Sequence, residues 1–161
     1  MDVTKYKLRE ISKHTVWFVS CLVLILAGVT IHPEPVWGQE TTQIQEAAER
    51  GDSDAAYFLG VMYRTGTKVP QDCRKALKWT KQAALQGNTL AQSHLGRIYK
   101  DGCGDEVGKH PVNAYIWTAL AAKQGLRYAA KNLGELEKQL HPYLLTEAQQ
   151  KVQNFKPKKG N

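Results

Sequence analysis

The chain has 161 residues, with 22 Lys and Arg against 15 Asp and Glu, a net charge of +7, and 42% hydrophobic residues. This length allows one modest domain and excludes two large ones, and the balance of apolar and charged residues excludes a wholly disordered chain. The positive charge serves either solubility or contact with an acidic partner.

Residues 1–38 have the layout of a secretory signal peptide. Four Lys and Arg residues at the start precede an uncharged apolar run over 15–31, and Val36 and Gly38 stand at positions −3 and −1 of a cut before Gln39. A membrane-spanning helix needs about 20 apolar residues, so the run is slightly short for an anchor. We therefore predict cleavage and a periplasmic or secreted protein. An inner-membrane protein anchored by residues 15–31 is the alternative.

The predicted location outside the cytosol decides which class of molecule the positive charge is expected to contact. Without residues 1–38 the chain keeps 18 Lys and Arg and 12 Asp and Glu. Outside the cytosol nucleic acid is not an expected partner for this positive charge. An acidic patch on another protein or an anionic envelope surface fits better.

The rest of the chain repeats itself. It reads "AAERG" at 47–51, "AALQG" at 83–87 and "AAKQG" at 121–125, with spacings of 36 and 38 residues. Leu-Gly pairs recur in the same register at 59–60, 95–96 and 133–134. A period of this length is typical of architectures in which each unit buries its apolar face against the next.

Each repeating unit reads as two helices. The apolar stripe of Ala55, Leu59 and Met62 recurs in the next unit and marks the first helix of the pair. First helices are predicted over 54–64, 89–100 and 128–140, and second helices over 73–86 and 112–124. Each second helix carries a tryptophan, at 79 or 117, which would fill the space between the layers.

Glycine stands inside each predicted first helix, at Gly60, Gly96 and Gly134. Such a glycine costs about 1 kcal/mol relative to alanine. The repetition predicts that the paired helix approaches closely at all three positions.

These residues resemble the Sel-one-like repeat, a relative of the tetratricopeptide repeat. The landmarks of the family pattern in the first copy are Ala55, Leu59, Gly60, Tyr63, Gly66, Val69, Asp72, Lys75, Ala76, Trp79, Ala83, Ala84 and Gly87. The second copy departs in its loop, "DGCGDEVGKHP", which is two residues longer and has His110 where Asp72 stands. The resemblance implies an all-α fold, a short α/α solenoid of tetratricopeptide-like helical hairpins. It also implies a protein that mediates binding to another protein, and we expect the chain to be a monomer.

The expected order of segments follows from this register. After the signal peptide we expect an N-terminal capping helix at 39–51, a first repeat at 52–87 and a second repeat at 88–125. A partial repeat with a C-terminal capping helix then covers 126–155, and a basic tail covers 156–161. Repeat arrays need such caps to cover their terminal apolar faces.

Residues of the first helices opposite the apolar stripe are the predicted contacts with a partner. They form three columns along the stack: Tyr57, Ser93 and Lys131; Val61, Arg97 and Glu135; and Arg64, Lys100 and Lys138. The third column is wholly basic, which predicts an acidic partner segment. His94, at the position of Phe58, is expected to be a half-buried packing residue.

Cys73 and Cys103 stand at the loop edge of successive repeats. Neighbouring loops in a stack run side by side, so a disulfide is geometrically possible, and it would close a loop of about 30 residues. The alternative is two separate thiols.

No motif of an enzyme or a cofactor site is found in residues 39–161. The segment "GCGDEVGKH" differs from a phosphate-binding loop in spacing, and Cys103, Asp105, Glu106 and His110 lack the paired spacing of a zinc site. We therefore predict no catalytic residue, no metal and no cofactor. Cysteine-rich members of the family have been described as penicillin-binding or β-lactamase-like, and a β-lactam-binding or hydrolysing enzyme is the alternative function.

Overall fold

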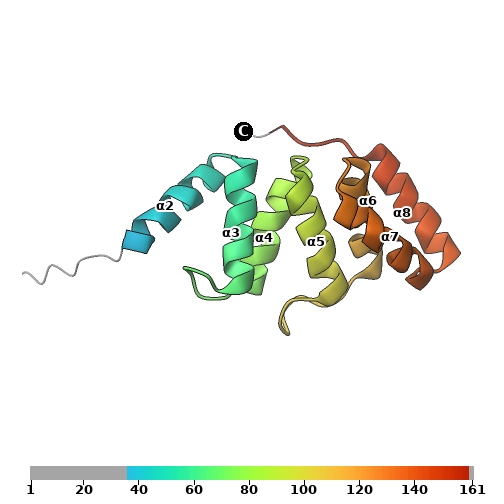
Figure 1. The fold of residues 1–161 in the computed structure, drawn as a ribbon, viewed down its shortest axis with the longest axis horizontal. Coiled ribbons are helices and arrows are strands. Elements are labelled where there is room, and N and C mark those ends of the chain that lie inside the picture. The colour runs from blue at the N-terminus through green and yellow to red at the C-terminus, as the bar shows by residue number, and fades with distance from the viewer. Residues whose placement is uncertain (1–35, 160–161) are drawn as a thin grey trace, which may run out of the picture. The chain divides into compact units, whose positions relative to one another are not determined.

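The computed structural model describes residues 36–159, and their side chains from residue 40 onward. These residues form seven α-helices and no strand: α2 (Val36–Glu49), α3 (Ser53–Thr65), α4 (Cys73–Leu85), α5 (Thr89–Asp101), α6 (Pro111–Lys123), α7 (Arg127–Gln139) and α8 (Pro142–Asn154) (Figure 1). The predicted class, an all-α solenoid of helical hairpins, is confirmed. The predicted apolar run at 15–31 lies outside the described residues, and within them no helix has the length and apolar character of a membrane span.

The helix ends have local causes. Asp52 and Asn88 accept hydrogen bonds from backbone N–H groups in the first turns of α3 and α5, and Asp72 does so for α4. His110 makes no such bond, and α6 begins with a proline in its first turn instead. Gly66 ends α3 in the left-handed region at φ 72°, where glycine is favoured.

Two hairpins, α3–α4 and α5–α6, form the centre of the fold. A Cβ on Gly60 would overlap Thr80 Oγ1 and lie 3.0 Å from the backbone nitrogen of Thr80. A Cβ on Gly96 would meet Thr118 in the same way, 3.1 Å from its backbone nitrogen. The glycines therefore let the two helices of each hairpin approach closely.

Gly134 on α7 does not share this arrangement. Nothing lies within 4 Å of a Cβ built on it, so the expected close approach at this third glycine is wrong. The α8 helix follows after only two residues, Leu140 and His141, and packs on α6 instead of along the glycine face of α7. The linkers that close the two hairpins are longer, 66–72 and 102–110, and allow the second helix to return beside the first.

Successive repeats are joined by apolar packing and by hydrogen bonds between residues about one repeat apart. Leu59, Leu95, Trp79 and Trp117 belong to one buried cluster that spans both hairpins. The side chain of Gln124 donates to the backbone oxygen of Gly87 at 3.0 Å.

The Cys73–Cys103 disulfide is present, with the Cα atoms 5.6 Å apart. It joins the first residue of α4 to the loop after α5. Two backbone hydrogen bonds between Cys103 and Val107 tighten that loop, and both residues are buried with Ile98 in a small apolar cluster.

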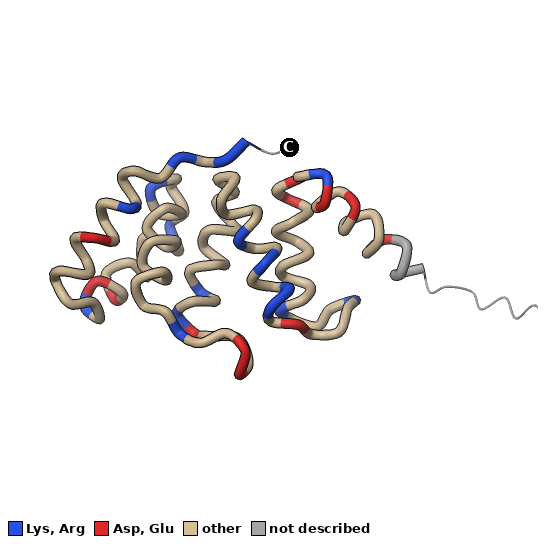
Figure 2. The backbone as a smooth tube through the Cα atoms, turned by 180° about the vertical axis from the view of Figure 1, so that it is seen from behind, with Lys and Arg blue, Asp and Glu red and all other residues tan. Residues whose placement is uncertain are grey.

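After α8 the chain turns back over α6 toward the end of α4 (Figure 1). Phe155 packs on Trp117 with ring centroids 5.9 Å apart, and the backbone N–H of Lys158 donates to the oxygen of Leu85 at 2.8 Å. Figure 2 shows Lys and Arg positions both along α4 and in this returning segment. Residues 156–159 of the segment predicted only as a basic tail therefore have a defined path.

Candidate functional site

Two adjoining depressions lie on the face formed by α3, α5 and α7. The larger, about 270 Å³, is lined by Tyr57, Leu90, Ser93, His94, Arg97, Leu126 and Tyr128. The smaller, about 60 Å³, shares Ser93, Arg97 and Tyr128 and adds residues such as Lys100, Asp101 and Asn132. We call the two together the α3–α5–α7 groove.

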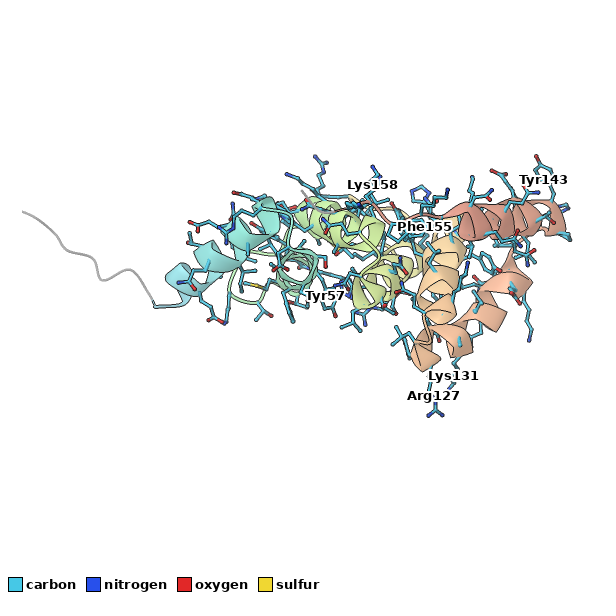
Figure 3. All side chains as sticks on the ribbon, turned by 90° about the horizontal axis from the view of Figure 1, so that it is seen from above. Tyr57, Arg127, Lys131, Tyr143, Phe155 and Lys158 are labelled. Carbon is cyan, nitrogen blue, oxygen red and sulfur yellow. A yellow bond between two sulfur atoms is a disulfide. The ribbon has the colours of Figure 1, made fainter. Side chains whose placement is uncertain are left out.

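One half of the groove is apolar and open to solvent. Leu90 is 51% exposed and Tyr128 is 60% exposed, and Phe58, next to Tyr57 on α3 and outside the lining, is 56% exposed. The ring of Tyr57 lies 5.5 Å from that of Phe58, and Figure 3 shows Tyr57 on the side of the helices that also carries Lys131. Large apolar side chains gathered on a surface are typical of interaction sites.

His94 forms part of the floor of the groove. It is buried, and burial together with the nearby charges of Arg97 and Arg64 lowers its pKa to about 4. The ring is therefore neutral at neutral pH. Arg97 Nη2 lies 3.3 Å from Nδ1, and because arginine only donates, Nδ1 accepts and the ring proton sits on Nε2. His94 is thus more deeply buried than the half-buried packing residue expected.

The other half of the groove carries charges of both signs. Arg97, Lys100 and Asp101 line it, and burial and the charge of Arg97 lower the pKa of Arg64, which stands outside the lining, while Asp101 acts in the opposite direction. Lys100 Nζ lies 3.6 Å from Glu135 Oε2 on α7. The column predicted as wholly basic is therefore partly compensated, because one of its lysines pairs with a residue of the neighbouring column.

The groove brings together four of the predicted contact residues: Tyr57, Ser93, Arg97 and Lys100. Glu135 reaches it through its ion pair with Lys100. The remaining predicted contacts stand outside the lining: Val61 and Arg64 on α3, half-buried, and Lys131 and Lys138 on α7, both exposed.

Sequence reasoning missed the main apolar residues of the groove, Leu90, Leu126 and Tyr128. They stand at the starts of α5 and α7, off the apolar stripe that marks the buried face. The sequence did contain a signal for them, because a large apolar residue outside the buried stripe is not needed for the core and can mark an interaction surface.

The described residues hold no group of three or more His, Cys, Asp or Glu side chains placed to bind a metal. Cys103, the sulfur donor of the metal cluster considered in the sequence, is used in the disulfide.

Comparison with known proteins agrees with this architecture. The family model of the Sel1 repeat matches residues 53–88 and 89–126. Chitin synthase regulatory factor 3 of Schizosaccharomyces pombe is 36% identical over 91 residues, which cover 55% of this chain and 10% of that protein. The chain thus spans only a small part of that relative.

Two solved structures have the same fold. The crystal structure of c5321, a protective antigen of uropathogenic Escherichia coli strains with an SLR fold, superposes with a TM-score of 0.67 at 30% identity, over 71% of this chain and 24% of that one. A Sel1 repeat protein from Oxalobacter formigenes superposes with a TM-score of 0.54 at 39% identity, over 57% of this chain and 68% of that one. The chain belongs to the Sel1-repeat family.

Proposed function

We propose that this protein binds another protein through the α3–α5–α7 groove and acts as an adaptor or scaffold. The observation that carries the proposal is the joint placement of exposed apolar side chains, Leu90 and Tyr128, and a cationic one, Arg97, around one groove. Aromatic side chains and arginine are the residues that contribute most at protein interfaces. The partner segment would place an apolar side chain against Tyr128 and a carboxylate against Arg97.

Two further observations support a binding role. The stacked hairpins present side chains of α3, α5 and α7 on one face, so an extended segment can contact several repeats at once. The relative from Schizosaccharomyces pombe is named as a regulatory factor of an enzyme.

The proposal includes export, because the start of the sequence has the layout of a signal peptide. The partner would then be a protein of the envelope or of the secreted fraction. Sequencing the N-terminus of the protein recovered from that fraction tests this part. A first residue at Gln39 is expected, and a chain that retains residues 15–31 in the membrane fraction would contradict cleavage.

Site-specific photo-crosslinking tests the groove. A photoreactive phenylalanine analogue at Tyr128 should capture a partner, while the same analogue at Lys123, exposed at the end of α6 and outside the groove, should not. Arg97→Glu should abolish capture from Tyr128 because it places a negative charge where an acidic segment binds. Equal capture from both positions, or capture that survives Arg97→Glu, would argue against this groove.

The alternative function, β-lactam binding or hydrolysis, stays a prediction from the resemblance. Turnover of nitrocefin by the purified protein tests it directly. Hydrolysis at a rate proportional to protein concentration would replace the adaptor proposal with an enzymatic one.

A further inference from the structure

The returning segment after α8, residues 155–159, forms a strap across the molecule on the side opposite the groove. Three contacts hold it: Phe155 on Trp117, Pro157 against Gly87, and the N–H of Lys158 on the oxygen of Leu85. Figure 3 shows Phe155 and Lys158 on one side of the helices and Tyr57 on the other. A site on the strap is therefore separate from the α3–α5–α7 groove.

The strap brings two lysines beside two lysines of α4. Together they line an open depression of about 480 Å³, with Glu49 and Gln82 on its wall; the lysines are Lys78, Lys81, Lys158 and Lys159. Among the described side chains, none of the four has an acidic partner in an ion pair. We call this depression the strap site.

The charges around the strap site do not cancel. Four ammonium groups face one carboxylate, that of Glu49. The C-terminal ends of α2 and α4 also lie here and contribute about half a negative charge each. Among the groups that the structure describes here, about two positive charges remain uncompensated. Their mutual repulsion opposes the observed path of the strap, and an anion bound among them would remove that repulsion.

We propose that the strap site binds a ligand that carries at least two phosphate groups. Its cationic residues are all lysines, which bind phosphate as compact point charges and do not require the planar bidentate geometry that arginine uses. The volume falls in the range of small-molecule sites, about 300–1,000 Å³, and suits more than one phosphate group. A soluble polyphosphate and adjacent phospholipid head groups share this chemistry.

Calorimetric titration of the full chain with tripolyphosphate tests the site. The double variant Lys158→Glu/Lys159→Glu should bind tripolyphosphate at least about tenfold more weakly than wild type. The matched control Lys131→Glu/Lys138→Glu makes the same change in net charge on α7, away from the strap site, and should leave the affinity unchanged. An equal loss in both variants would mean that only net charge matters and would overturn the proposal. Citrate binding as tightly as tripolyphosphate would overturn the assignment to phosphate.

A second arm identifies the source of the phosphate. Flotation with vesicles of phosphatidylglycerol and phosphatidylcholine is compared between wild type and the strap variant, so that any contribution of the apolar run at 15–31 is common to both. A loss of flotation in the variant without tripolyphosphate binding assigns lipid head groups, and tripolyphosphate binding with unchanged flotation assigns a soluble polyphosphate. Failure of both measurements to separate wild type from the variant overturns the proposal, and it leaves the groove proposal untouched because the two sites share no residue.

Discussion

His94 is buried near the charges of Arg97 and Arg64, and this placement links its protonation to the stability of the fold. An unfolded histidine has a pKa near 6.5, and the folded one has a pKa of about 4. Between these values the unfolded chain binds a proton that the folded chain does not. Stability is therefore complete above about pH 6.5 and is lost as the pH falls toward 4, by up to about 3 kcal/mol.

The equivalent position in the first repeat is Phe58. The substitution His94→Phe should therefore remove the loss of stability at low pH. We expect the variant to lose about 2–3 kcal/mol less stability than wild type between pH 7 and pH 4.5. Urea unfolding at the two pH values measures the difference. His110→Gln is the control, because this histidine is exposed and makes no capping bond, and it should follow wild type. A His94 variant with the wild-type pH dependence would contradict the assignment.

The helices carry three glycines at equivalent positions, and their surroundings predict effects of opposite sign. Gly60→Ala and Gly96→Ala force a methyl group into Thr80 and Thr118 of the paired helix, and we expect each to destabilise the protein by about 1–3 kcal/mol. Gly134→Ala meets no atom within 4 Å and should stabilise α7 by about 0.5–1 kcal/mol through helix propensity alone. Thermal unfolding of the three variants measures these changes in stability. Destabilisation by Gly134→Ala as well would show that α7 is paired like α3 and α5.

Within the described domain, one disulfide links the two repeats covalently. The Cys73–Cys103 bridge closes a loop with a sequence separation of 30 residues, which corresponds to about 3–4 kcal/mol in the chain-entropy model. Dithiothreitol should lower the free energy of unfolding of wild type by this amount, measured in urea. The double variant Cys73→Ser/Cys103→Ser should already have the lower value and should not respond to dithiothreitol. Wild type that is insensitive to the reductant would contradict a stabilising bridge.

The repeating pattern alone predicted the central hairpins closely. The helix expected at 73–86 is observed as Cys73–Leu85, and the one expected at 89–100 as Thr89–Asp101. This worked because helix starts, helix stops and apolar stripes are encoded by residues at most about four positions apart. It failed at Gly134, since whether a glycine is covered depends on where a different helix packs.

The same reasoning predicted only part of the groove. Tyr57, Ser93, Arg97 and Lys100 were found because helical spacing places them opposite the buried stripe. Tyr128 and Leu90 were not, because an apolar residue at a helix start can be covered or exposed, and only the neighbouring helix decides which.

The sequence by itself determined the all-α hairpin architecture, its period and the family to which it belongs. Each of these can be recognised from residue patterns that are local in the chain. Only the tertiary structure decided that Cys73 meets Cys103, that α8 packs on α6, and that residues 155–159 return to α4. These contacts join residues 30 or more positions apart or depend on linker length, and no local pattern specifies the path of the chain between them.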